Sequence, residues 1–138
     1  MFPLLLLVAC APDLPAGWED AEPIADFHQA ACEGDPYGKF EPTVSAAESD
    51  GGLAITYDKA VFRCEQDVEG FYKLDGDTVS VLVQPIDMNP SIVAGCDCLY
   101  TLDMGVEATG ATVEMWRRWD NLNDPNDPVL IDTVEVAE

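Results

Sequence analysis

Basic side chains are scarce in this sequence of 138 residues. Lys and Arg number 6 against 27 Asp and Glu, which gives a formal net charge of -21 at pH 7. A surface of this charge repels the phosphate backbone of nucleic acids and the anionic headgroups of lipids. The sequence therefore predicts no nucleic-acid partner, and any attachment to a membrane must come from a covalent anchor.

Sets of residues for catalysis or for a tightly bound metal are also lacking. His28 is the only histidine, and we expect it to be a packed, hydrogen-bonded residue. Cys96 and Cys98 do not have the Cys-x-x-Cys spacing of thioredoxin-like and zinc sites. No nucleophile is placed beside a base, and the carboxylates are too numerous to single out a pair. We therefore expect no enzyme activity and no cofactor, with a carboxylate-dependent hydrolase as an alternative.

The sequence opens with an apolar run, residues 1–8, followed by Ala9 and Cys10. This run is too short to span a bilayer and is typical of a secretion signal. Leu7-Val8-Ala9-Cys10 resembles the lipobox of bacterial lipoproteins, which are cut before the cysteine and receive diacylglycerol on its thiol. The resemblance implies a signal peptide over residues 1–9, a lipid on Cys10, and a location on the bacterial cell envelope, facing the periplasm or the exterior. The alternatives are an ordinary secretion signal, or a buried N-terminal strand with a free Cys10.

The remaining length is enough for one hydrophobic core. Prolines and glycine between Ala11 and Gly17 predict a short tether over residues 10–17, ahead of a single domain over residues 18–138. Pro23 suits the first turn of a helix, Gly34 suits its end, and the residues between them fit one helical stripe. We therefore expect one short N-terminal helix that begins near Pro23.

From Lys39 onward the patterns are those of strands and turns. The segment from Cys96 to Met104 alternates with period two, which is typical of a half-buried strand. A change of phase predicts a bulge near Asp58-Lys59. Asp75-Gly76 predicts a two-residue hairpin turn that sets Tyr72 opposite Val79. About seven short strands at regular spacing predict an all-β protein, an antiparallel β-sandwich with one short N-terminal helix.

Three segments carry a wider resemblance. Phe62-Arg63-Cys64, the hairpin strand Val79-Ser80-Val81-Leu82-Val83, and Cys96-Asp97-Cys98-Leu99-Tyr100 look like segments of uncharacterised, β-rich bacterial envelope lipoproteins. Those proteins have a lone cysteine after one strand and a Cys-x-Cys-x-Tyr pattern in a later one. The resemblance implies a fold and a location and adds no activity.

If Cys10 carries a lipid, four cysteines remain, which suits two structural disulfides in an oxidising compartment. A bond between Cys96 and Cys98 would strain the strand that holds both, so we exclude that pairing. Two pairings remain. We expect Cys64–Cys98 with Cys32–Cys96, because Cys96 faces the loop side that the expected helix must reach, and the other pairing stays open.

Two further segments are candidate sites. Trp116-Arg117-Arg118-Trp119 places a tryptophan beside an arginine on each face of a strand, which suits either a spot for partner binding or cation–π packing. The following loop is rich in oxygen ligands, which suits Ca²⁺, although Asp and Asn before Pro are also ordinary turn formers; its candidate ligands are Asp120, Asn123, Asp124 and Asp127. We therefore expect a non-enzymatic, lipid-anchored envelope protein that is structural or binds a protein or glycan partner. A carbohydrate- or calcium-binding module is the alternative.

Overall fold

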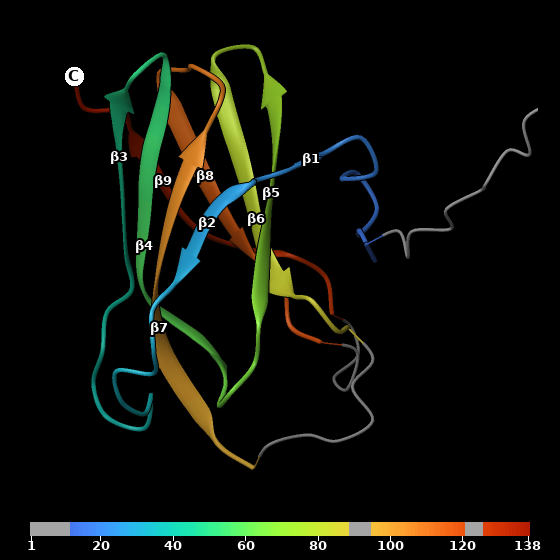
Figure 1. The fold of residues 1–138 in the computed structure, drawn as a ribbon, viewed down its shortest axis with the longest axis vertical. Coiled ribbons are helices and arrows are strands. Elements are labelled where there is room, and N and C mark those ends of the chain that lie inside the picture. Colours follow the sequence, from blue (N-terminus) through green and yellow to red (C-terminus); the bar gives the residue numbers. More distant parts are fainter. Residues whose placement is uncertain (1–11, 89–94, 121–125) are drawn as a thin grey trace, which may run out of the picture.

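The structure is a computed structural model that describes residues 12–88, 95–120 and 126–138. These residues form nine β-strands and no helix, arranged as two sheets that face each other across a shared core (Figure 1). One sheet contains, in spatial order, β1 (Glu22–Pro23), β5 (Val68–Asp75), β6 (Thr78–Pro85), β8 (Thr112–Arg117) and β9 (Val129–Glu135). The other contains β2 (Asp26–Gln29), β7 (Asp97–Val106), β4 (Gly52–Arg63) and β3 (Thr43–Ser49).

The expected all-β class is confirmed, but the strands are not all antiparallel. β6 and β8 pair in parallel, with Val81 opposite Met115, and every other neighbouring pair is antiparallel. The parallel pair arises because the chain crosses to the other sheet for β7 before it returns as β8. Because β7 carries the chain back along the molecule, β8 begins beside the start of β6 and runs in the same direction.

The expected N-terminal helix is wrong. Residues that fit a helical stripe between Pro23 and Gly34 are extended instead, first as β1 and then as β2. β1 pairs with β5 in one sheet, and β2 pairs with β7 in the other, with Phe27 opposite Met104. The same residues also fit period two, and the hydrogen bonds available along β7 decide between the two patterns. This crossing segment joins the two sheets along one side of the molecule.

The opposite side is joined near the C-terminus. Ala137 donates a backbone hydrogen bond to the carbonyl of Ala46 and accepts one from the amide of Glu48. This contact connects β3 to the chain just beyond β9. Both long sides of the sandwich are therefore bridged by backbone hydrogen bonds, which protects edge strands from pairing with other chains.

The core follows the predicted alternation in β7. Cys98, Tyr100, Leu102 and Met104 are all buried on the inner face. The expected bulge is confirmed, because the pairing of β4 with β7 shifts between Tyr57 and Ala60. Lys59 takes a φ of 59° there, in the left-handed region. The bulge lets the inward-facing residues on both sides of it reach one core.

The hairpin between β5 and β6 forms, but its register differs from the prediction by two residues. Tyr72 lies opposite Val81, not Val79, and the turn residues are Gly76 and Asp77. Gly76 has a φ of 59°, so glycine supplies the left-handed residue at the start of the turn. A shift of two residues leaves each side chain on the expected face, since successive side chains alternate.

The disulfides are Cys32–Cys98 and Cys64–Cys96, so the expected pairing is wrong and the one left open is found. The register explains this outcome. Arg63 lies opposite Asp97, which brings Cys64 directly opposite Cys96 across the two strands, with Cα atoms 5.6 Å apart. The exclusion of Cys96–Cys98 is confirmed. Two disulfides indicate an oxidising compartment outside the cytoplasm.

Over the ranges that the structure covers, no helix has the length and apolar character needed to cross a membrane.

Candidate functional site

β6 is buried on both of its faces, which draws attention to the outer surface of the five-stranded sheet. Val79, Val81 and Val83 face the core, while Ser80, Leu82 and Gln84 point outward and are buried as well. The N-terminal segment 12–21, which we call the strap, covers these outward-facing side chains. Trp18 of the strap is buried against Trp116 in an edge-to-face contact with ring centroids 6.4 Å apart. Pro15 is buried as well, so the described part of the predicted tether, residues 12–17, belongs to the packed strap.

A second set of contacts holds the strap near Asp13. Arg118 is buried and donates hydrogen bonds to the carbonyl oxygen of Asp13 at 2.7 Å and to the side-chain oxygen of Gln84 at 3.2 Å. Gln84 donates to the same Asp13 carbonyl at 3.0 Å and to the carboxylate of Glu69 at 3.2 Å. Arg118 also donates to the carbonyl of Asn126 at 3.0 Å. These bonds connect the strap, β6, β5 and the chain before β9.

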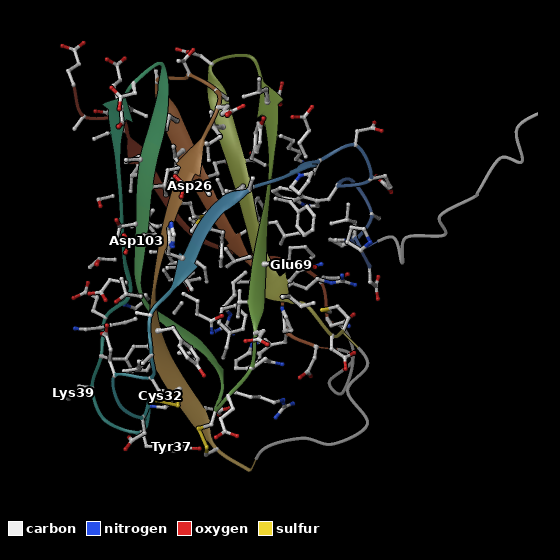
Figure 2. All side chains as sticks on the ribbon, viewed as in Figure 1. Asp26, Cys32, Tyr37, Lys39, Glu69 and Asp103 are labelled. Atoms are coloured by element: carbon white, nitrogen blue, oxygen red, sulfur yellow. A yellow bond between two sulfur atoms is a disulfide. The ribbon has the colours of Figure 1, made fainter. Side chains whose placement is uncertain are left out.

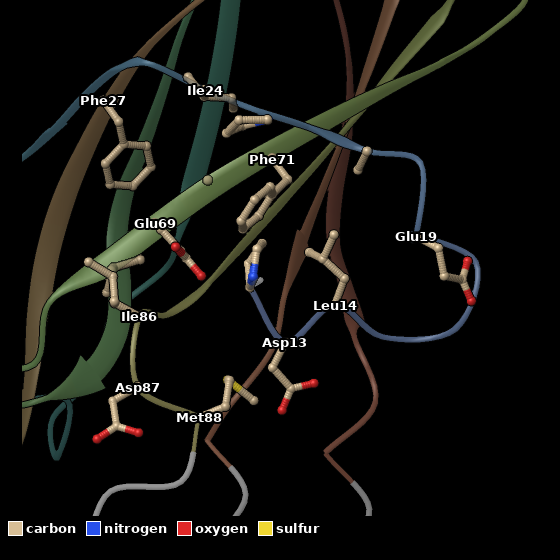
Figure 3. A pocket seen from close by; sticks show the side chains of 15 residues that line it. Asp13, Leu14, Glu19, Ile24, Phe27, Glu69, Phe71, Ile86, Asp87 and Met88 are labelled. Atoms are coloured by element: carbon tan, nitrogen blue, oxygen red, sulfur yellow. The ribbon is translucent and has the colours of Figure 1, made fainter. Parts of the chain in front are cut away.

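Beside this network, a pocket of about 1310 Å³ opens along the edge of β5 that β1 and the following residues cross. Its walls come from the strap, from the crossing segment between β1 and β2, and from the chain that follows β6 (Figure 3). The apolar lining includes Leu14, Ile24, Phe27, Phe71, Ile86 and Met88. Ile86 is 58% exposed, so an apolar surface is open to an occupant at the mouth of the pocket.

Close packing shapes the wall of the pocket at Gly70. A Cβ atom at Gly70 would lie 2.9 Å from the ring of Phe27 and 3.2 Å from Ile24. Gly70 also accepts a backbone hydrogen bond from the amide of Ile24 at 2.9 Å. Glycine is therefore required where the crossing segment passes over β5, because any side chain would push Phe27 out of the wall.

The charge of the pocket is entirely negative among the lining residues that the structure describes. Four carboxylates line it, from Asp13, Glu19, Glu69 and Asp87 (Figure 3). Burial raises the pKa of Glu69, and the hydrogen bond from Gln84 opposes that shift. An apolar wall with carboxylates around it can bind an apolar group that carries a positive charge.

The predicted interaction segment lies partly behind this pocket. Trp116 and Arg118 face the strap, while Arg117 and Trp119 face the end of the core. The guanidinium of Arg117 lies 4.1 Å from the ring of Trp119, and burial lowers the pKa of Arg117. These contacts are the cation–π packing that the sequence offered as one interpretation. Direct binding of a partner by this segment stays a prediction.

The structure describes two of the four predicted calcium ligands, Asp120 and Asp127. Asp120 is fully buried, and its carboxylate accepts hydrogen bonds from Arg63 at 2.7 and 3.2 Å and from Gln66 at 3.2 Å. A cation at that carboxylate would have to displace the arginine. Asp127 is exposed, and Asn123 and Asp124 lie outside the described residues. Within the described ranges, no group of three or more His, Cys, Asp or Glu side chains is arranged to hold a metal ion.

His28 lies on β2, on the outer face of the four-stranded sheet, and its side chain is 77% exposed. Its Nε2 is 2.9 Å from the carboxylate of Asp26, and its register partner on β7 is Asp103 (Figure 2). The expected hydrogen bond is confirmed and the expected packing is wrong. The error follows from the helix that was expected here, since that helix would have turned His28 inward.

Sequence patterns did not mark Glu69 or the pocket. The pocket is formed by three segments that are far apart in the chain, so no local pattern of residues in the sequence predicts it. One available signal was the apolar run Val81-Leu82-Val83, which is typical of a strand that is covered on both faces. Comparison with protein-family models, curated proteins and solved structures gives no match.

Proposed function

We propose that this chain is a non-enzymatic, lipid-anchored protein of the bacterial cell envelope whose domain binds a cationic amphiphile in the pocket beside the strap. The apolar part of the ligand fills the space between Phe27, Phe71 and Ile86, and its positive end lies against the carboxylates. The observation that carries the proposal is this combination of an open apolar lining with four acidic and no basic residues among those described. Attraction between opposite charges selects the ligand class.

The envelope location rests on two other features. The lipobox-like residues Leu7-Val8-Ala9-Cys10 support a lipid on Cys10, and the two disulfides fit an oxidising compartment. Pro12, which lines the pocket, is only two residues from Cys10. The pocket would therefore lie close to the membrane surface, where amphiphiles gather.

Calorimetric titration with three decyl compounds tests the ligand class. Decyltrimethylammonium, decyl maltoside and decyl sulfate have the same apolar chain and differ in charge at the head. We expect one saturable site for the cationic compound, weaker binding of the neutral one, and weakest binding of the anionic one. Equal affinities for all three compounds would contradict the proposed role of the carboxylates.

Two matched variants place the binding site. Ile86→Ser removes apolar surface at the pocket mouth, whereas Leu74→Ser removes it at the hairpin, where the side chain is 57% exposed and outside the pocket. Burial of about half an isoleucine side chain is worth about 1 kcal/mol, which is about fivefold in affinity. We expect that loss for Ile86→Ser and none for Leu74→Ser. Equal losses in both variants would show that the amphiphile binds the acidic surface without using the pocket.

A further inference from the structure

The two disulfides lie against each other at the end of the sandwich where β4 ends and β7 begins (Figure 2). The Sγ atoms of Cys64 and Cys98 belong to different disulfides and are 3.0 Å apart. Neither sulfur carries a hydrogen, so this is a direct sulfur–sulfur contact and not a hydrogen bond. The four sulfurs therefore form a series in the order Cys32, Cys98, Cys64, Cys96.

The two ends of this series differ from its middle in their exposure. Cys32 and Cys96 belong to exposed residues, whereas Cys98 is 5% exposed and Cys64 is half-buried. A thiol from solution therefore reaches an outer sulfur first. Whichever disulfide it opens, the sulfur that is released is an inner one, next to the inner sulfur of the other disulfide.

We propose that the four cysteines form a thiol–disulfide exchange site, in which a two-electron reduction by small thiols moves the remaining disulfide to Cys64–Cys98. In the first step, a thiolate attacks Sγ of Cys96, which forms a mixed disulfide and releases the Cys64 thiolate. That thiolate attacks Sγ of Cys98, which forms the Cys64–Cys98 bond and releases the Cys32 thiolate. Attack at Cys32 gives the same inner bond and releases Cys96.

A second thiol completes the reaction. It attacks the mixed disulfide and leaves with the first thiol as an external disulfide, so Cys96 also becomes a thiolate. Two external thiols are oxidised to one disulfide, and one protein disulfide is reduced to the thiols of Cys32 and Cys96. The product still carries a bond between β4 and β7, because Cys64 follows β4 directly and Cys98 lies in β7. The reduced domain thus keeps a covalent link across its central strand pair.

Two single variants test the contact on which this exchange depends. Cys96→Ser and Cys64→Ser remove the same disulfide, and both are made in the full chain with Cys10→Ser, so that the fifth cysteine adds no thiol. Cys96→Ser leaves the Cys64 thiol beside the Cys32–Cys98 bond, whereas Cys64→Ser leaves only Cys96, at the far end of the series. Free thiols are allowed to equilibrate at pH 8.5 and are then blocked with N-ethylmaleimide.

In the Cys96→Ser protein, we expect the label on Cys32 as well as on Cys64, because the bond exchanges between Cys32–Cys98 and Cys64–Cys98. In the Cys64→Ser protein, we expect the label on Cys96 alone. Label confined to Cys64 in the first variant would overturn the proposal. Label on Cys32 in both variants would overturn it too, since exchange would then not depend on the inner contact.

A measurement with all four cysteines in place covers the case in which a variant does not fold. The Cys10→Ser chain is partly reduced with 2-mercaptoethanol, a neutral thiol that the acidic surface does not repel, and is then blocked. Cleavage before Asp97 separates Cys96 from Cys98, so mass spectrometry identifies the bridge in singly bridged molecules. We expect Cys64–Cys98. Retention of Cys32–Cys98 or Cys64–Cys96 as the single bridge would refute the exchange.

Discussion

Arg117 and Arg118 are adjacent, yet the structure predicts opposite consequences when each is replaced by methionine. Arg118 donates to the carbonyls of Asp13 and Asn126 and to the side-chain oxygen of Gln84. The Asp13 carbonyl still accepts a hydrogen bond from Gln84, so the stability lost at this carbonyl is small. The side-chain oxygen of Gln84, which is fully buried, loses the donor that Arg118 supplies, and a buried acceptor without a donor costs about 1–3 kcal/mol. The bond from the guanidinium to the carbonyl of Asn126 is lost as well, which adds about 1 kcal/mol. Arg118→Met should therefore destabilise the domain by about 2–4 kcal/mol.

For Arg117, the cost of burying the charge offsets much of what its contacts contribute to stability. Its Nη1 donates to the carbonyl of Val61 at 3.1 Å, but its buried Nε has no acceptor among the residues that the structure describes. Burial of the charge already lowers the pKa of Arg117, so methionine relieves a desolvation cost, which offsets the loss of the cation–π contact with Trp119. We expect Arg117→Met to change the free energy of unfolding by about 1 kcal/mol or less.

Urea denaturation followed by tryptophan fluorescence measures the difference between the two variants. With a slope of about 1.5 kcal/mol per molar urea, a loss of 3 kcal/mol lowers the midpoint by about 2 M. Arg118→Met should show that shift, and Arg117→Met should stay within about 0.7 M of the parent protein. Equal shifts in the two variants, or a larger shift for Arg117→Met, would refute the reasoning.

Three other expectations can be checked separately. Burial raises the pKa of Glu69, so the folded state binds the proton of this carboxyl more tightly than the unfolded state does. The stability that this proton contributes is lost as pH rises above about 4.3 and through the folded pKa. Thermal melts should show Glu69→Gln gaining stability over the parent at pH 7 and losing that gain at pH 4, while Glu114→Gln, which is outside the pocket, should show a smaller change. Gly76→Ala should cost about 1–2 kcal/mol in chemical denaturation, because Gly76 has a φ of 59°, and Asp75→Ala should cost less. Cys10→Ser should abolish incorporation of radiolabelled lipid and partition into membranes, and wild-type protein that stays unlabelled would contradict the lipobox prediction.

The alternation of apolar and polar residues correctly predicted those strands that have one face in the core. The inner face of β7 and the bulge at Asp58-Lys59 were both visible in the order of apolar residues, because the pleat fixes their period. The helix near Pro23 was predicted wrongly because the segment fits two periods. Its partner strand β7 begins more than 60 residues later, so the deciding hydrogen bonds could not be seen locally.

The candidate site was predicted least well, for a related reason. The sequence marked Arg118 through its neighbour Trp119 but gave no reason to connect it with Asp13, 105 residues earlier. Glu69 lies on a strand of ordinary pattern and becomes distinctive only where the crossing segment and the strap enclose it. Even the disulfide pairing depended on the register of β4 against β7, which a shift of one or two residues would have changed.

The docked strap has a consequence for the height of a lipid-anchored domain above the membrane. Asp13 is held by Arg118 and Gln84, so the first fixed point is only three residues beyond Cys10, a reach of about 10 Å at most. Insertion of ten Gly and Ser residues between Ala11 and Pro12 adds a flexible span of about 17 Å, and it changes no contact within the described residues. Neutron reflectometry of the lipidated protein on a neutral supported bilayer should therefore show the domain of the inserted variant farther from the bilayer, by on the order of 10–17 Å. The charge of -21 makes a neutral bilayer necessary, because anionic lipid would lift both proteins. An unchanged distance would mean that the strap does not stay docked beside the pocket when the anchor is in place.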